Sequence, residues 1–128
     1  MLLALLLSCT DYTINEKISA DVIVAPEEID FGHLLSGHES KQKEFTIFNP
    51  TMMDVVVQRL ELSGRNYFID ESGFTISPNS YHQIEVTYNP ATYEHNEGFV
   101  DIYLEGHDDP IRSVWLDGNG DAPVIDIN

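Results

Sequence analysis

The sequence predicts an all-β fold, a sandwich of seven to eight short strands. Apolar and polar residues alternate over several stretches of four to eight residues, which is the pattern of strands that bury one face. Turn residues separate these stretches, and no stretch of ten or more residues shows helical spacing with caps. Seven or eight such strands in about 100 residues are typical of a β-sandwich.

The size and charge of the chain agree with one folded domain and exclude some partners. The chain has 128 residues, of which 42% are hydrophobic, enough for one core. Its 22 Asp and Glu against 6 Lys and Arg give a net charge of −16, spread along the sequence. Such a surface repels phosphate backbones and anionic headgroups, so we expect no nucleic-acid partner and no membrane docking through basic residues.

The first nine residues, MLLALLLSC, are an apolar run that ends at the single cysteine, Cys9. The run is similar to a bacterial lipobox, in which a small residue precedes a cysteine that becomes the lipidated first residue. It is shorter than the about 20 apolar residues that span a bilayer, and it lacks the basic start of a signal peptide. We therefore expect residues 1–9 to be part of a lipoprotein-type signal segment that starts upstream, with Cys9 as the lipidation site. The alternative is a buried structural cysteine in an apolar strand.

The rest of the chain divides into a tether, a sandwich and a short exit segment. Residues 10–21 are polar and show neither a period of 2 nor one of 3.6, which favours a tether. Residues 22–122 are expected to form the sandwich, and residues 123–128 to begin a linker or a following domain. Alternation is clearest in four stretches of the sandwich, EFTIF (44–48), YHQIEVTY (81–88), FVDIYL (99–104) and SVWL (113–116).

Turns are expected between these strands. Asn49-Pro50 and Asn89-Pro90 each follow a strand, and proline ends a strand because it cannot donate to the ladder. Flexible turn positions are supplied by Ser36-Gly37, Ser63-Gly64, Ser72-Gly73, Gly106 and Gly118.

One strand carries an irregularity. In DVVVQRLELSG, Val55 and Val57 are at odd positions and Leu60 and Leu62 at even positions, so in a regular strand the two pairs would face opposite sides. A β-bulge near Gln58-Arg59 would bring both pairs to the core, because it adds one residue to the strand.

Six short elements follow one another in the chain: Asp30-Phe31-Gly32, Gly37, Asn49-Pro50, Val86-Tyr88-Pro90, Gly98 and Leu116-Gly118-Gly120-Pro123. Their order resembles the immunoglobulin-like domains of the ASH and hydin type, also met in bacterial choice-of-anchor D proteins. The likeness covers about residues 22–122 and implies an immunoglobulin-like sandwich used for binding and assembly, with no catalytic residues. APVIDIN at the end resembles the first strand of another such domain, as in a tandem array.

The five histidines do not predict a metal site. A zinc site needs three or four converging ligands, and on a sheet these usually lie two residues apart on one face. The sequence holds no His-x-His pair and no second cysteine. We expect His33 at a strand end, His38 in a turn, His82 at a sheet rim, and His95 and His107 in loops.

Calcium is the one cofactor that the sequence suggests. In DGNGD, Asp117, Asn119 and Asp121 match the start of a calcium loop, in which oxygen ligands at alternate positions wrap the ion. The match is partial, since Ala122 stands where the loop needs glycine and Asn128 where it needs glutamate. The alternative is a strand-ending turn and linker.

The aromatic residues Phe99, Tyr103 and Trp115 are predicted to face outward on adjacent strands. Together they form a candidate binding patch for a protein. The alternative is that they pack under the tether or under a following domain.

No catalytic motif occurs: there is no G-x-S-x-G, no phosphate loop and no H-E-x-x-H. The leading hypothesis is a non-catalytic binding or spacer module in the bacterial cell envelope, periplasmic or surface-exposed. A lipid on Cys9 would be its membrane contact, and its partner a protein or the neighbouring domains of an array. One alternative is an accessory domain of a larger secreted or surface enzyme. Another is a PapD-like chaperone, whose basic anchor would come from Arg59, Arg65 or Arg112.

Overall fold

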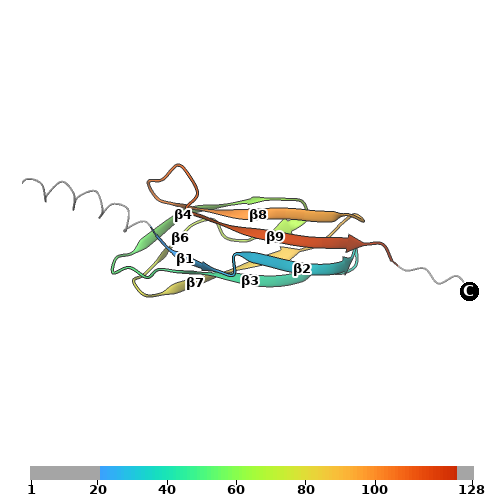
Figure 1. The fold of residues 1–128 in the computed structure, drawn as a ribbon, viewed down its shortest axis with the longest axis horizontal. Helices are drawn as coiled ribbons and strands as arrows, with labels where there is room; N and C mark the ends of the chain where they lie inside the picture. Colours follow the sequence, from blue (N-terminus) through green and yellow to red (C-terminus); the bar gives the residue numbers. More distant parts are fainter. Residues whose placement is uncertain (1–20, 124–128) are drawn as a thin grey trace, which may run out of the picture.

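The computed structural model describes residues 21–123, which fold into two packed β-sheets (Figure 1). One sheet has four strands in the order β1-β3-β7-β5, and the other has five in the order β2-β9-β8-β4-β6. The strands are β1 (Ile23–Ala25), β2 (Glu28–Leu35), β3 (Lys41–Phe48), β4 (Val55–Ser63), β5 (Tyr67–Phe68), β6 (Phe74–Ile76), β7 (Tyr81–Tyr88), β8 (His95–Leu104) and β9 (Arg112–Asp121).

This architecture confirms the all-β sandwich. The described part of the chain holds nine strands rather than seven to eight. The difference arises because β1, β5 and β6 have only two or three residues each, too few to show alternation. Within residues 21–123 we find no helix of the length and apolar character needed to cross a membrane.

The chain changes sheets near its start. Strand β1 pairs antiparallel with β3, and after the cis peptide bond Ala25-Pro26 the chain crosses to the other sheet as β2. There β2 runs parallel to β9, while the other strand pairs are antiparallel. The second strand and the last strand of the described chain therefore lie side by side in one sheet (Figure 1).

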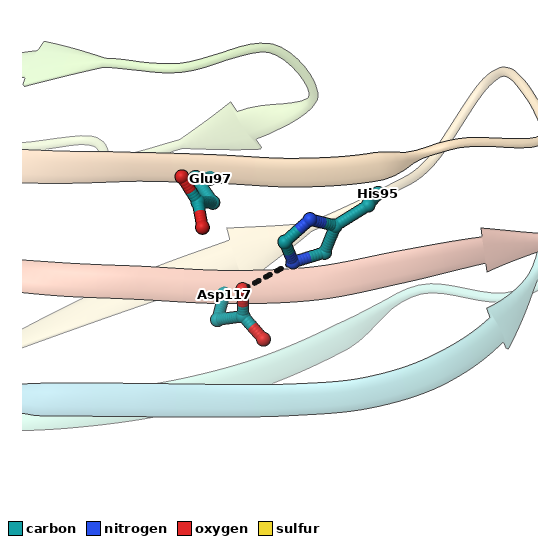
Figure 2. A group of neighbouring side chains, drawn as sticks. All are labelled: His95, Glu97 and Asp117. Atoms are coloured by element: carbon teal, nitrogen blue, oxygen red, sulfur yellow. Dashed lines mark hydrogen bonds and ion pairs between the residues drawn. The ribbon is translucent and has the colours of Figure 1, made fainter.

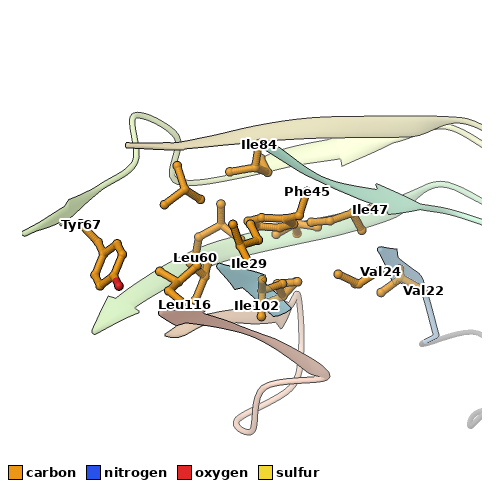
Figure 3. Packing of buried hydrophobic residues seen from close by; sticks show 14 of the residues in the cluster. Val22, Val24, Ile29, Phe45, Ile47, Leu60, Tyr67, Ile84, Ile102 and Leu116 are labelled. Carbon is orange, nitrogen blue, oxygen red and sulfur yellow. The ribbon is translucent and has the colours of Figure 1, made fainter. Parts of the chain in front are cut away.

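The core lies between the two sheets and comes from the predicted alternation. Apolar side chains of β3 and β7 meet those of β8 and β9, and their burial contributes about 1.5–3 kcal/mol each (Figure 3). These residues are at most 2% exposed: Phe45, Ile47, Ile84, Val86, Tyr88, Val100, Ile102, Val114 and Leu116.

The predicted β-bulge in β4 is confirmed. Val57 lies opposite Leu104, and Arg59 lies opposite Tyr103, so the register shifts between them. Because of the extra residue, odd positions face the core before the bulge and even positions face it after the bulge. Val57 and Leu60 are therefore both buried.

A second irregularity explains the Asp-Phe-Gly element. The register of β2 against β9 shifts between Asp30 and His33, where Gly32 has a φ of 72°. Glycine adopts this conformation without steric cost. The Asp30 carboxylate accepts a hydrogen bond of 2.8 Å from the Gly32 amide, and the strand then continues to Leu35.

Candidate functional site

The outer face of the five-stranded sheet gathers acidic side chains from three strands. Glu97 on β8 lies opposite Asp117 on β9, and Asp117 lies beside Asp30 on β2. The three residues form one row across the sheet, because residues in register on neighbouring strands point to the same side. Glu28 lies two residues before Asp30 on β2, in register with Trp115.

These residues line a shallow groove of about 460 Å³, which we call the outer-face groove. Its lining comes from β2, β8 and β9. The lining residues are Glu28, Ile29, Asp30, Glu97, Trp115, Leu116 and Asp117. Trp115 is 57% exposed, so a large aromatic ring at this groove is open to solvent.

His95 adjoins the groove, where it bonds Asp117 and lies near Glu97 (Figure 2). His95 and Glu97 lie two residues apart on β8, and the potential ligand atoms of His95, Glu97 and Asp117 lie within 4.8 Å of one another. His95 Nε2 and Asp117 Oδ1 are 2.5 Å apart. Both side chains are about half exposed, at 48% and 47%. This cluster has one nitrogen and two oxygen donors, a set that a divalent ion accepts.

The position of His95 corrects the sequence interpretation, which expected a loop. His95 begins β8, which starts four residues before the predicted FVDIYL stretch. The early part of β8 shows no apolar alternation, because its inward residues are Asn96 and Gly98. The sequence signal for this cluster is the pair His95-x-Glu97, whose side chains point to the same face of a strand. The pair indicates a site only if the strand begins at His95, as it does in the structure.

The loop expected for DGNGD is also not formed. Strand β9 continues to Asp121, so Asp117, Asn119 and Asp121 lie along an extended strand and not in a loop whose backbone curves around an ion. Asp117 pairs with His95, and Asp121 Oδ1 lies 3.0 Å from His33 Nδ1. Asn119 lies in register with both histidines. Calcium binding by Asp117, Asn119 and Asp121 stays a prediction, without the loop that motivated it.

The expected aromatic patch is smaller than predicted. Phe99 lies opposite Trp115, with the two ring centroids 5.5 Å apart in an edge-on arrangement. Tyr103 is only 9% exposed, so the prediction that it joins an open patch is wrong. Arg59 covers it: the guanidinium lies 3.8 Å from the centroid of the Tyr103 ring and pairs with Glu61 at 2.7 Å.

His82, His38 and His107 are not among the residues that line the groove. His82 is half-buried at the rim, as expected, where it pairs with Glu71 at 2.6 Å and stacks on Phe74. His38 lies in the turn after β2, and His107 lies between β8 and β9.

Among the described residues, only His95 pairs with a groove carboxylate, Asp117, and no lysine or arginine does. In residues 21–123 the three arginines pair with Glu61, Glu94 and Asp21. The Lys43 ammonium donates to the backbone carbonyl of Asp30, not to its carboxylate. Burial, and then the charge of the Asp117 carboxylate, raise the pKa of Tyr88 in the core.

Three predicted segments lie outside the described residues. They are the Cys9 lipidation site with residues 1–9, the tether up to residue 20, and residues 124–128.

Comparisons with known proteins bear on the fold. No protein-family model matches the sequence, and a search of curated proteins found no match. The ASH/PapD-like domain 7 of human CEP192 superposes with a TM-score of 0.67 at 13% identity, over 83% of this chain and 89% of that one. The periplasmic chaperone SfaE gives a TM-score of 0.61 at 8% identity, over 83% of this chain and 61% of that one.

A third structure is a secreted serine protease, VesC from Vibrio cholerae. It gives a TM-score of 0.59 at 14% identity, and the match covers 89% of this chain but only 26% of the protease chain. At these identities the likeness concerns the fold. The chain therefore has the immunoglobulin-like β-sandwich fold of ASH and PapD-like domains.

Proposed function

We propose that the chain is a non-catalytic protein-binding module whose contact surface is the outer face of β2, β9 and β8. The outer-face groove carries this proposal. It combines a concave shape, a tryptophan that is 57% exposed and four carboxylates on a rigid sheet. Exposed tryptophans at the centre of a surface patch are frequent anchors of protein interfaces. The fold supports the same conclusion, since one structure that shares it is a periplasmic chaperone.

Site-specific photo-crosslinking in the producing cell tests this surface. A benzophenone amino acid at Glu97, on the groove, should capture a discrete protein partner, because the side chain is exposed beside Trp115. The matched control places the same group at Gln83, which is exposed on the outer face of the other sheet. Equal crosslinking at both positions, or none at Glu97, would reject the groove as the contact surface.

The proposal extends to location: the module is held in a bacterial envelope by a lipid on Cys9. Support comes from the lipobox-like Leu6-Leu7-Ser8-Cys9 and from the likeness to a periplasmic chaperone and a secreted protease. Mass spectrometry of the membrane-bound protein should find a mature N-terminus at Cys9 carrying acyl mass. An intact Met1 in a membrane-free fraction would contradict it.

One observation favours a second candidate, an accessory domain of a larger secreted or surface enzyme. The same fold makes up about a quarter of the VesC chain, which is a secreted protease. The complete reading frame distinguishes the two candidates, because the accessory role requires a catalytic domain on the same polypeptide.

A further inference from the structure

We infer that the outer-face groove binds an arginine side chain of the partner protein. This inference rests on the proposed binding function and names the chemistry of its partner. The groove has four carboxylates; within residues 21–123 His95 pairs with one of them, Asp117, and no lysine or arginine pairs with any. A cationic group is therefore the complementary occupant.

On the outer face of the five-stranded sheet, Arg59 already makes the two contacts that we infer for the partner's arginine. The Arg59 guanidinium lies 3.8 Å from the centroid of the Tyr103 ring and bonds Glu61 at 2.7 Å. The arginine thus combines an aromatic face with a carboxylate, two contacts that a planar guanidinium makes at once.

The groove repeats the elements of that arrangement without the arginine. Asp101 lies two residues from Tyr103 along β8, and Asp117 lies two residues from Trp115 along β9, so each aromatic ring has an acidic row at its side. The acidic row beside Tyr103 contains Glu61 and Asp101, whereas the row beside Trp115 contains Glu97, Asp117 and Asp30. The Tyr103 ring is covered by Arg59 and the Trp115 ring is open to solvent.

Arginine fits this groove better than lysine does. Tryptophan is the strongest aromatic partner of a cation, and a guanidinium can stack on it while donating two parallel bonds to a carboxylate. An ammonium offers one point charge and stays more strongly hydrated. Phe99 supports the Trp115 ring edge-on from the neighbouring strand, which holds the stacking surface in place.

The chain offers a direct readout, because Trp115 is its single tryptophan. The full chain is titrated with a short peptide that carries two arginines between glycines, and the indole fluorescence is followed. The matched peptide carries citrulline in place of arginine, which keeps the shape and removes the charge. We expect the arginine peptide to bind at least fivefold more tightly than the citrulline peptide.

Two double variants distinguish peptide binding by the groove from general attraction to the negative charge of the protein. Glu28→Gln with Asp30→Asn removes two groove carboxylates, and the amide oxygen of the new side chain at position 30 can still accept the Gly32 N–H bond. Glu44→Gln with Glu85→Gln removes two facing carboxylates from the outer face of the other sheet. We expect the groove variant to weaken peptide binding at least fivefold and the control variant to leave it unchanged. Equal weakening by both variants would mean general charge attraction and would overturn the inference.

Other outcomes are equally decisive. Equal affinity for the arginine and citrulline peptides overturns the inference. So does the absence of any peptide response together with stoichiometric binding of zinc chloride that is lost in His95→Ala, because the site would then belong to a metal. If the crosslinking at Glu97 succeeds while the arginine peptide fails, the binding function stands and the arginine inference falls.

Discussion

Buried polar side chains hold the turns of this sandwich. Asn49, which is fully buried, donates from its Nδ2 to the carbonyls of Met53 and Ile76, at 2.7 and 2.9 Å. Its Oδ1 accepts bonds from the backbone N–H and the hydroxyl of Thr51. Among residues 21–123, no buried side-chain nitrogen or oxygen lacks a partner. Asn49 therefore ties the end of β3 to the end of β6, which gives a physical role to the asparagine before Pro50.

We expect Asn49→Ala to lower the free energy of unfolding by about 2–3 kcal/mol, because it leaves several buried groups without a partner. Urea denaturation measures this change. Asn89 is the matched control, since it also precedes a proline but is exposed. Asn89→Ala should cost less than about 0.5 kcal/mol. Similar losses for the two variants would contradict this role of Asn49.

A second residue-scale prediction concerns His33 and pH. The hydrogen bond to the Asp121 carboxylate, and then its charge, raise the pKa of His33 above the ordinary value. Stability from this pair is present below the unfolded-state pKa and is lost as the pH rises through the folded-state pKa. The contribution is small because the imidazole is exposed.

NMR titration of the His33 ring protons measures the shift directly. Asp121→Asn should lower the pKa of His33 toward about 6.5. Asp108→Asn removes a carboxylate from the loop between β8 and β9 and should leave the His33 titration in place. An identical His33 midpoint in the wild type and in Asp121→Asn would contradict the assignment.

At the scale of elements, Gly118 and Gly120 belong to strand β9, although the sequence indicated a turn there. Gly118 and Gly120 continue the inward parity of Val114 and Leu116, and both are buried. A side chain at position 118 would enter the Tyr88 ring, and one at position 120 would meet the Thr92 carbonyl. The glycines are thus strand positions whose inward space is filled by other elements.

We expect Gly118→Ala to destabilise the fold by about 1–3 kcal/mol, the usual cost of overfilling a packed core. The new methyl group would lie 2.5 Å from one carbon of the Tyr88 ring. That ring cannot move freely, because its hydroxyl donates to Asn96 at 2.6 Å and its face stacks on Tyr67.

The double variant Gly118→Ala/Tyr88→Leu tests the steric explanation. Replacing the ring removes the clash, so the two losses in unfolding free energy should add up to more than the loss of the double variant. Chemical denaturation of the four proteins completes this cycle. Strictly additive losses would mean that Gly118 is required for another reason.

At the scale of the whole molecule, net charge opposes folding. The chain carries 22 acidic against 6 basic residues, and each side chain in the ion pairs of residues 21–123 is at least 35% exposed. Exposed pairs contribute about 0–1 kcal/mol each, so they do not offset the repulsion among many carboxylates.

The melting temperature should therefore rise with sodium chloride. Between about 10 mM and 100 mM salt the screening length falls from about 30 to 10 Å. A gain of about 1 kcal/mol corresponds to about 4–8 °C for a domain of this size. Potassium chloride should give the same rise, since the effect is screening. A melting temperature that falls or stays constant would contradict the prediction.

The sequence predicts a strand well where its inward positions are apolar, and poorly where they are polar or glycine. The alternation in β3 and β7 and the parity change in β4 correctly indicate inward faces, because each depends on neighbours along one strand. The early part of β8 and the late part of β9 were missed, because their inward positions hold Asn96, Gly98, Gly118 and Gly120. These residues carry no apolar signal.

The sequence by itself determined the all-β sandwich, the β4 bulge and the acidic surface, because periodicity and composition are properties of short segments. Only the tertiary structure decided that Asp30, Glu97 and Asp117 share one row and that Arg59 covers Tyr103. Those neighbours are set by the register of strands far apart in the chain, above all the parallel pairing of β2 with β9. Register depends on how the two sheets bury their common core, and no single segment encodes it.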